Sequence, residues 1–442
     1  MSSSTTSTPP PPLDDPSVTD PLECPPLRWG ILGCGRVSHD FTQALKHLPS
    51  QSVAACSARS ELSAKAFAEK HGIDKYYGSY DAMLQDEAVQ IVYVGNVHSL
   101  RRSTGEKCLL ANKHVLLEKP FACSVEDGEY LIGLAKERNL FLMEVCIYIS
   151  YIHSLLNLRL ITFEACLGSP THPLTHAHAF DLKGMWTRFF PAVQKARELA
   201  LGKDSEPSAL GEIAKVYSDF NFQAGDSEEY PTSFVYQPQL GGGSSLLVAP
   251  YPIAAATLFF GSKEPEKVLV AGQMDESQNV DLQAAAVLSF PATSNQMPAK
   301  DPNTSDRTVK LPGAGTATLS FGMVVESEEE TTVVGTKGRL TIKTPAHCPT
   351  TLTLKLKSDG RGNIGEETFY YPLPEETDEI KKAGGFFYPN STGFIYEAAA
   401  VARCIAAGKT QTPQYNLNET MLNLKIIEQI REELGLPPVV PT

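Results

Sequence analysis

Two glycines near the N-terminus stand where a phosphate group could be bound. The stretch GILGCGRVS, which begins at residue 30, contains Gly33 and Gly35 in the spacing Gly-x-Gly-x-x-Ser, directly after a short β-rich run. Glycines at this spacing permit a tight turn and let backbone N–H groups at a helix N-terminus reach a pyrophosphate. The pattern predicts dinucleotide binding with Arg36 and Val37 beside the phosphates, although an ordinary strand-to-helix turn can carry the same glycines.

The second β-rich run ends in CSARS, where a guanidinium stands in place of an acid. A site that prefers NAD usually has Asp or Glu there, because a carboxylate accepts hydrogen bonds from the ribose 2′-hydroxyl. A guanidinium instead binds a 2′-phosphate through forked, charge-assisted hydrogen bonds. The sequence therefore predicts NADP as the cofactor, with Ser57, Arg59 and Ser60 at its ribose. The alternative is a solvated arginine at the start of a helix.

A third candidate is the lysine in HVLLEKPFA, residues 114–122. Glu118 and Lys119 follow a fifth predicted strand, and open α/β sheets bind ligands at the carboxyl ends of their strands. A lysine at this edge can lie beside a nicotinamide and a substrate hydroxyl, whereas the alternative is a surface lysine before a helix. Together with Asn96, which follows the preceding strand, these residues complete the predicted cofactor-binding set.

These side chains need a sheet that brings strand ends together. From residue 27 to residue 144, short β-rich runs alternate with helical stretches, which predicts a doubly wound parallel sheet with right-handed crossovers. Ser60 is expected to cap one of the helices and Gly72 to end it. After about residue 200 the strands follow one another, which predicts a mainly antiparallel sheet with helices on one face. The predicted elements of this second part are strands at 211–223, 267–274, 282–290, 316–325, 331–342 and 351–357, and closing helices at about 393–407 and 417–434.

Several short motifs occur in one order along nearly the whole chain. They are GILGCGRVSHDF, CSARS, YGSYDAML, KHVLLEKPFA, MWTRFFPAV, GGG followed by PYP, GTKGRLTI and YEAAAVARCI, between residue 30 and about residue 404. In this order they resemble the glucose–fructose oxidoreductase and inositol dehydrogenase (Gfo/Idh/MocA) family. More narrowly, they are similar to its branch of dimeric dihydrodiol dehydrogenases and NADP-dependent D-xylose 1-dehydrogenases.

The resemblance implies an α/β fold with two domains. Residues 27–200 would form an NADP-binding Rossmann domain with a doubly wound parallel sheet. Residues 201–442 would form an α+β domain with a large, open-faced, mainly antiparallel sheet, through which two copies of such chains often form a homodimer.

The resemblance also assigns roles by position. Lys119 matches the catalytic lysine of the Glu-Lys-Pro motif, and Tyr251 matches the general acid/base tyrosine. One residue departs from the pattern: relatives have an aspartate four residues before the tyrosine, and here that position is Leu247. Positions i and i+4 share a helix face, so this substitution changes the neighbour of the tyrosine. The residues that match the wall of the family's substrate pocket are Trp186, Arg188 and Phe189.

These roles predict an NADP-dependent dehydrogenase acting on a sugar hydroxyl, with D-xylose oxidised to D-xylono-1,5-lactone as the leading hypothesis. The alternative substrate is trans-1,2-dihydrobenzene-1,2-diol, and the residues do not separate the two. Because Leu247 replaces the aspartate, a catalytically impaired NADP-binding regulatory protein is a further alternative.

Composition indicates which classes of binding partner to expect and in which cellular compartment the protein is located. The formal net charge is −13, and nucleic acids and anionic membranes call for a basic face, so neither partner is expected. Residues 1–26 hold eight prolines and no Lys or Arg, which is typical of a disordered tail and not of a secretory or mitochondrial signal. The nine cysteines are scattered without a CxxC pair, which favours reduced thiols in a cytoplasmic protein.

Residues 145–183 differ from their neighbours, since without them FLME would continue directly as GMWTRFFP. A membrane span is disfavoured because Arg159 and Glu164 interrupt the apolar run. A lid loop of this length within a compact domain is uncommon. Three histidines could ligate a metal by residue type, but no Cys or carboxylate is placed with them, and no metal site is predicted. These histidines are His172, His176 and His178.

Our hypothesis for this stretch is a retained intron. Val145-Cys146, Leu174-Thr175 and Lys183 can be encoded by the donor, branch and acceptor patterns of a short spliceosomal intron. Transcript sequencing tests this, and cDNA that mostly keeps these codons would contradict it.

Overall fold

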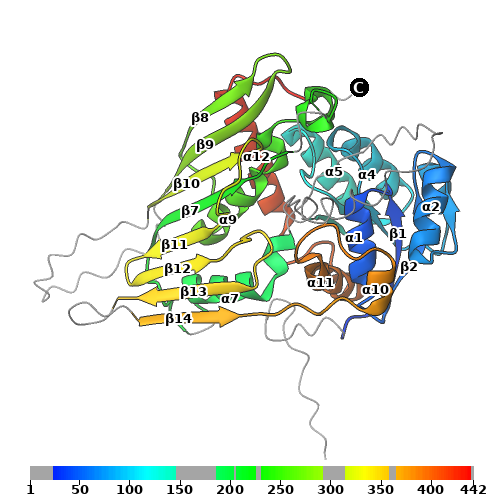
Figure 1. Ribbon diagram of the computed structural model, residues 1–442, viewed down its shortest axis with the longest axis horizontal. Coiled ribbons are helices and arrows are strands. Elements are labelled where there is room, and N and C mark those ends of the chain that lie inside the picture. The colour runs from blue at the N-terminus through cyan, green and yellow to red at the C-terminus, as the bar shows by residue number, and fades with distance from the viewer. Residues whose placement is uncertain are drawn as a thin grey trace, which may run out of the picture.

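The computed structural model describes residues 23–145, 186–203, 206–224, 230–291, 314–357 and 365–439. The predicted tail up to residue 22 lies outside the described residues, as does the 145–183 stretch apart from Val145. Figure 1 shows an open sheet on one side of the molecule, a mixed sheet-and-helix unit on the other, and helices between them.

The first domain is built on a six-stranded parallel sheet in the order β3-β2-β1-β4-β5-β6, the order of dinucleotide-binding folds. Side chains of β1 alternate between two cores: Trp29 and Ile31 enter one, and Leu32 enters the other. Both faces of the sheet are therefore buried, as expected for parallel strands covered by helices. The elements are β1 (Leu27–Leu32), α1 (Arg36–Leu45), β2 (Gln51–Ser57), α2 (Glu61–His71), β3 (Tyr76–Tyr77), α3 (Tyr80–Leu84), β4 (Ile91–Val94), α4 (Arg101–Leu110), β5 (His114–Leu117), α5 (Val125–Glu137) and β6 (Leu142–Glu144).

Local signals set the ends of these helices. Ser60 caps α2 by accepting a hydrogen bond from the Ser63 N–H at 3.2 Å, and Gly72 ends it in the left-handed region with φ of +70°. Both predictions are confirmed.

The second domain carries an eight-stranded sheet in the order β14-β13-β12-β11-β7-β10-β9-β8. The pair β7 and β10 is parallel and the other described pairs are antiparallel, so the predicted class is confirmed. The strands are β7 (Ile213–Asn221), β8 (Lys267–Asp275), β9 (Val280–Phe290), β10 (Gly315–Gly322), β11 (Thr331–Gly335), β12 (Gly338–Ile342), β13 (Thr351–Leu356) and β14 (Gly365–Tyr370).

Two features of this sheet differ from the prediction. The single strand expected at 331–342 is a hairpin, because the chain turns between Gly335 and Gly338. Strand β14 was not predicted, since its sequence GEETFY is exposed along nearly its whole length and lacks the apolar alternation of a half-buried strand.

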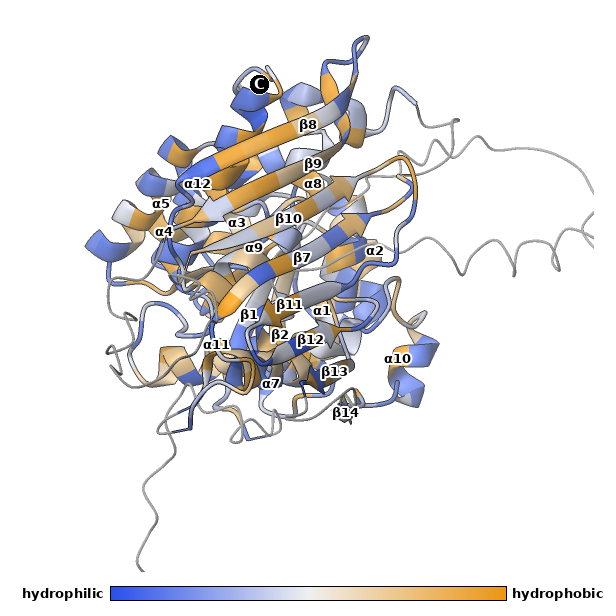
Figure 2. Cartoon of the chain, turned by 90° about the vertical axis from the view of Figure 1, so that its left-hand side faces the viewer, coloured by the Kyte–Doolittle hydropathy of each residue, from blue (hydrophilic) through white to orange (hydrophobic). Residues whose placement is uncertain are grey.

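Helices cover one face of the second sheet and leave the other open. Helix α9 (Pro250–Phe260) packs on β7 and β10, α7 (Pro191–Leu201) on β12, and α12 (Leu417–Glu433) on β8. Figure 2 looks onto the open face, with the strands in front and the helices behind. This arrangement places α9 between the sheet and the first domain (Figure 1).

The chain returns to the first domain near its end. The segment with α10 (Asp378–Lys382), the short turn η7 (Ser391–Gly393) and α11 (Phe394–Ala406) packs against α1. The Asp40 carboxylate in α1 accepts backbone N–H bonds from Phe387 at 2.9 Å and Tyr388 at 3.0 Å. Residues from both ends of the sequence therefore stabilise the cofactor-binding half.

Within the described residues, no single helix is long and apolar enough to cross a membrane, although the bent pair Pro238–Leu247 and Pro250–Phe260 passes on length and composition. The same residues contain no group of three or more His, Cys, Asp or Glu placed to hold a metal ion. The histidines considered above as metal ligands lie outside the described part of the chain.

Candidate active site

The glycine turn after β1 lies against the ends of the neighbouring strands. The Gly33 N–H donates to Ser57 O at 2.9 Å, and the Gly95 N–H donates to Leu32 O at 2.8 Å. Gly33 has φ of +89°, and a Cβ on it would lie 2.8 Å from Gly95 O. Only glycine fits such a turn without displacing the next strand.

Helix α1 begins at this turn with Gly35 as its N-cap, and no side chain caps it. Backbone N–H groups of a first helical turn have no partner within the helix, so they can bind an anion. Ser38 fills the third position of the motif, and a Cβ on Gly95 would lie 2.3 Å from its Oγ. The turn and helix start thus fit the pyrophosphate of a dinucleotide, with Arg36 and Val37 in the first turn.

The residues predicted to bind the cofactor ribose differ in their exposure to solvent. Arg59 and Ser60 are exposed beyond the end of β2. Ser57 is buried, and its hydroxyl donates to Tyr77 O at 3.1 Å. Its side chain therefore stabilises the pairing of β2 with β3. Arg36 is half-buried, with its guanidinium carbon 5.8 Å from the centre of the Phe387 ring.

Glu118 and Asn96 lie at the predicted edge but form internal contacts. Glu118 is fully buried and accepts a 2.5 Å hydrogen bond from the Tyr93 hydroxyl on β4. The Asn96 amide donates to the Thr104 hydroxyl at 2.8 Å. These contacts hold the loops that follow β4 and β5, and Lys119 lies on the second of these loops.

Lys119 and Tyr251 meet although they come from different domains. Lys119 is 1% exposed, and its Nζ lies 5.3 Å from the centre of the Tyr251 ring. The same ammonium donates to the backbone O of Leu247, at the end of helix α8 (Ser244–Leu247). Leu247 thus contacts the lysine through its main chain, while its side chain is buried in the core.

A cavity beneath the sheet has Tyr251 in its wall. The Tyr251 ring also contacts two other aromatic rings edge-on, Phe220 at 4.9 Å and His347 at 5.9 Å between ring centres. The polar residues lining the cavity are Thr187, Arg188, Ser218, Asp219, Glu329, Thr331 and His347. Neither His347 nor Glu329 was predicted, because no sequence pattern links them to a tyrosine so distant in the chain.

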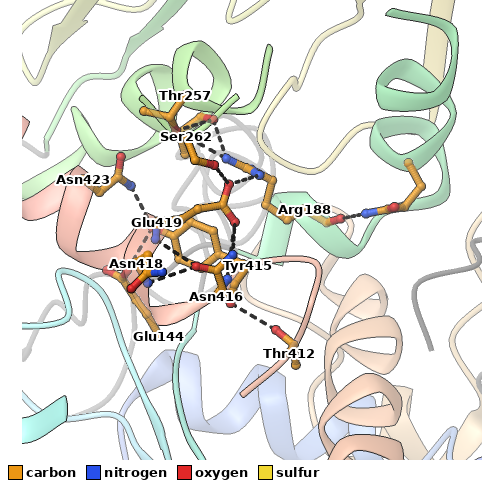
Figure 3. Close-up of polar contacts among 12 residues, drawn as sticks. Glu144, Arg188, Thr257, Ser262, Thr412, Tyr415, Asn416, Asn418, Glu419 and Asn423 are labelled. Carbon is orange, nitrogen blue, oxygen red and sulfur yellow. Dashed lines mark hydrogen bonds and ion pairs between the residues drawn. The ribbon is translucent and has the colours of Figure 1, made fainter. Parts of the chain in front are cut away.

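Arg188 borders this cavity but is held by other protein groups. It is 3% exposed, lies 3.1 Å from the Glu419 carboxylate on α12, and donates to Ala254 O on α9 at 2.9 Å. Figure 3 shows Glu419 between Arg188 and the Ser262 hydroxyl, which donates to it at 2.8 Å. This network joins the segment after the first domain to the helix that carries Tyr251.

The two aromatic residues predicted beside Arg188 lie elsewhere. Trp186 is fully buried against Phe190 and Phe394, with ring centres 4.8 Å from each, and it is not among the cavity-lining residues. Phe189 borders a separate small cavity with Tyr396 and Arg403. The described structure therefore brings one of the three predicted pocket residues to Tyr251.

Buried carboxyl groups lie behind the site. Glu144, at the end of β6, accepts hydrogen bonds from the Phe121 N–H at 2.8 Å and the Tyr415 hydroxyl at 3.2 Å. Burial raises the pKa of Glu144 to about 7, although these bonds oppose the shift. Burial, with Glu118 and Glu144 nearby, also holds the pKa of Glu397 well above its usual range.

Comparison with protein families assigns both domains. The family described as "Oxidoreductase family, NAD-binding Rossmann fold" matches residues 27–145, and "GFO/IDH/MocA C-terminal domain" matches residues 205–341. The chain belongs to the Gfo/Idh/MocA family of oxidoreductases. Its first domain is thus a nicotinamide dinucleotide-binding Rossmann domain, and the predicted family is confirmed.

Curated relatives match over nearly their whole length. The chain is 29% identical to trans-1,2-dihydrobenzene-1,2-diol dehydrogenase of Danio rerio over 414 residues, which cover 93% of this chain and 97% of the relative. The enzyme of that name from Homo sapiens is also 29% identical, with the same coverage. These names favour the predicted alternative, a diol, over D-xylose.

Solved structures share the fold. A 3-ketoreductase from Actinomadura kijaniata, solved with NADP and TDP-benzene, superposes with a TM-score of 0.65 at 21% identity, covering 92% of this chain and 98% of that one. An aldose-aldose oxidoreductase from Caulobacter crescentus gives a TM-score of 0.65 at 21% identity, covering 93% and 98%. Family and relatives together make this chain an NAD(P)-dependent oxidoreductase that acts on CH–OH groups.

Proposed function

We propose that this protein is an NADP-dependent dehydrogenase that oxidises one hydroxyl of a vicinal diol, the substrate class for which its curated relatives are named. The observation that carries the proposal is the meeting of Lys119 and Tyr251 at the carboxyl edge of the parallel sheet. D-xylose remains the second candidate substrate.

The geometry supports a general base built from these two residues. Tyr251 is the group proposed to accept the proton of the substrate hydroxyl, with the Lys119 Nζ 5.3 Å from the centre of its ring. Bound NADP supplies the acceptor for the hydride that leaves the same carbon. Loss of this proton and hydride converts the C–OH group to a carbonyl, and the burial of both residues keeps water from competing.

NADP is proposed over NAD because of the end of β2. Arg59 is exposed there, and no Asp or Glu occurs from Val53 to Ser60 to repel a 2′-phosphate. The structural neighbour from Actinomadura kijaniata was solved with NADP, which is consistent with this proposal.

The open face of the second sheet supports the proposed homodimer. A cross-strand row on this face contains Leu269, Val287, Thr318 and Tyr217, of which the three largest are 50%, 39% and 42% exposed. Aligned apolar and β-branched side chains on an uncovered sheet face suit a second copy of the same face. We also propose a cytoplasmic location, which the seven free cysteines of the described residues support.

A second candidate function follows from Leu247. An apolar residue where relatives carry an aspartate suits a protein that binds NADP but turns over poorly. The contact between Lys119 and Tyr251 is retained, which favours the dehydrogenase over this second candidate.

The proposal is tested by a substrate panel with purified full-length protein. NADPH formation is followed by absorbance with trans-1,2-dihydrobenzene-1,2-diol, D-xylose and simple alcohols. We expect the highest kcat/KM with the diol. A higher kcat/KM with D-xylose would restore the sugar dehydrogenase, and NADP binding without turnover of any substrate would support the regulatory protein.

A further inference from the structure

Two cysteines meet at the cofactor-binding edge of the first domain. Cys34 is the residue between the two glycines of the turn after β1, and Cys56 lies on β2 directly before Ser57. The Gly33 N–H donates to Ser57 O at 2.9 Å, and the Cys34 thiol donates to the same oxygen at 3.5 Å. The turn and the end of β2 are therefore joined through both main chain and side chain.

The two thiols also contact each other. The Cys34 thiol hydrogen-bonds to Cys56, and this bond lowers the pKa of Cys56, although burial opposes the shift. The thiolate is the form of cysteine that acts as a nucleophile. Cys56 is fully buried, whereas Cys34 is only partly buried. A small oxidant can therefore reach Cys34, and a nucleophilic thiol lies behind it.

Four other cysteines of the described residues have the opposite chemistry. Burial raises the pKa of Cys108 and of Cys123 to about 12, and that of Cys404 to about 11. It also holds the pKa of Cys348 well above its usual range. Thiols of this kind stay protonated near neutral pH and react slowly with oxidants, so they contrast with the pair at the glycine turn.

We propose that Cys34 and Cys56 form a reversible disulfide when a hydroperoxide oxidises Cys34, and that this disulfide weakens NADP binding. The Cys34 sulfur attacks one oxygen of hydrogen peroxide, breaks the O–O bond and becomes a sulfenic acid, while hydroxide leaves. The Cys56 thiolate then attacks the Cys34 sulfur, forms the S–S bond and releases a second hydroxide. The hydroxides take up the two thiol protons, so two thiols are oxidised and one peroxide is reduced to two waters.

The disulfide changes the geometry on which cofactor binding depends. Forming the S–S bond draws two sulfurs from hydrogen-bond distance to covalent distance, so the turn or the end of β2 must move. The turn has little room, since a Cβ on Gly33 would already lie 2.8 Å from Gly95 O. Helix α1 begins after Gly35 and Arg59 follows β2, so the movement reaches the groups proposed for the pyrophosphate and for the 2′-phosphate. The effect on binding rests on the proposed cofactor and not on the proposed substrate.

The test follows the bond and its effect in the full-length protein. After treatment with hydrogen peroxide, the remaining thiols are alkylated, and trypsin releases Cys34 in residues 29–36 and Cys56 in residues 47–59, each with no other cysteine. Mass spectrometry without reductant should find these two peptides linked, and dithiothreitol should separate them. The NADP dissociation constant should rise about tenfold on oxidation, the effect of one lost hydrogen bond, and return on reduction.

Three variants separate this pair from other targets of peroxide. Cys34→Ser removes the thiol that the peroxide reaches and keeps a hydroxyl donor for Ser57 O, so no linked peptide should form and peroxide should leave its NADP dissociation constant unchanged. In Cys56→Ala the sulfenic acid at Cys34 meets no second thiol, and dimedone should trap it. Cys108→Ala, which removes a fully buried thiol of α4, is the matched control and should respond to peroxide as the wild type does.

Each outcome bears on a defined part of the inference. If the reduced wild type binds NADP but gives no linked peptide after peroxide, the disulfide is refuted. A linked peptide with an unchanged dissociation constant, or an equal rise of that constant in Cys34→Ser, refutes the effect on binding. A reduced wild type that binds no NADP refutes the proposed cofactor together with the effect on binding, and the linked peptide still decides whether the disulfide forms.

Discussion

At the scale of single residues, the site depends on contacts between groups far apart in the chain. Lys119 extends from the edge of the parallel sheet to the backbone O of Leu247, so the lysine is positioned by the very segment that lacks the family aspartate. A main-chain carbonyl holds the ammonium whatever the side chain is. This explains how the lysine and Tyr251 can stay together despite the substitution.

We propose that one exposed side chain, Arg59, sets the preference for NADP over NAD. Arg59→Ala should weaken NADP binding by about 1.5–3 kcal/mol, the usual contribution of a hydrogen bond to a charged group, and change NAD binding little. Arg59→Asp should invert the preference, because a carboxylate repels the phosphate and accepts from the 2′-hydroxyl. Dissociation constants from fluorescence titration check both variants. Equal weakening of both cofactors in Arg59→Ala would show that Arg59 does not contact the 2′-phosphate.

Glu144 predicts how stability changes with pH. Burial raises its pKa in the folded protein to about 7, against 4.5 for the free side chain. Between these values the folded state holds a proton that the unfolded state releases, so stability falls as pH rises from about 4.5 to about 7. The free energy of unfolding should fall by about 3 kcal/mol across this range because of Glu144, and Glu144→Gln should remove this fall.

Urea unfolding at pH 5 and pH 8 measures the effect of Glu144→Gln. The exposed Glu137→Gln on α5 is the control and should keep the wild-type dependence on pH. An identical pH dependence in wild type and Glu144→Gln would show that Glu144 is ionised in the folded protein throughout the range.

The sequence predicts the candidate residues that belong to a motif, such as Gly33, Lys119 and Tyr251, and the structure brings Lys119 and Tyr251 together. The sequence does not indicate that the Ser57 hydroxyl donates to Tyr77 O, or that Trp186 is buried among aromatic rings. His347 was missed because its neighbours Phe220 and Tyr251 lie on other elements. Side-chain partners brought together by the fold leave no local pattern in the sequence.

At the scale of elements, buried polar contacts connect the helices behind the site. Helix α12 begins with a capping box in which Asn416 and Glu419 exchange hydrogen bonds, and Glu419 also pairs with Arg188. In Figure 3 this carboxylate lies at the centre of the network. The position of α9, and with it Tyr251, therefore depends on the start of α12.

Arg188 should act on stability more than on substrate binding. Arg188→Met leaves the Glu419 carboxylate buried without its cation, and such losses cost about 3–5 kcal/mol. Thermal unfolding should show a clearly lower Tm, whereas Lys65→Met, which breaks the exposed Lys65–Glu69 pair on α2, should change stability by less than about 1 kcal/mol. An unchanged Tm with a raised KM in Arg188→Met would return Arg188 to the substrate pocket.

The elements themselves were largely predictable. The helices expected at about 393–407 and 417–434 are α11 and α12, at Phe394–Ala406 and Leu417–Glu433. Two errors in the second sheet, the 331–342 hairpin and β14, fall where turn residues or exposed polar residues hide the strand pattern.

At the scale of the whole molecule, the two sheets serve different purposes. The parallel sheet gathers strand ends for the cofactor, and the second sheet backs the cavity with its inner face while its outer face stays open (Figure 2). The return of α11 to α1 was not visible in the sequence, since a contact between the two ends of a chain has no local signature.

The open face predicts the oligomeric state. Light scattering should find a dimer, and Val287→Lys should give a monomer with an unchanged circular dichroism spectrum, because paired copies would face each other with buried charges. Val325→Lys, at a residue 54% exposed beyond the end of β10, should remain dimeric. A Val287→Lys dimer would place the interface elsewhere.

The central claim is that Lys119 and Tyr251 make this NADP-binding chain a working diol dehydrogenase. It is tested most directly by measuring NADP binding and NADPH formation with trans-1,2-dihydrobenzene-1,2-diol on the same samples of wild type and Tyr251→Phe. We expect both proteins to bind NADP equally and the variant to turn over at least about a hundredfold more slowly, since it lacks the general base but keeps the ring. NADP binding by the wild type without NADPH formation from any diol or sugar, or wild-type turnover in Tyr251→Phe, would contradict the claim.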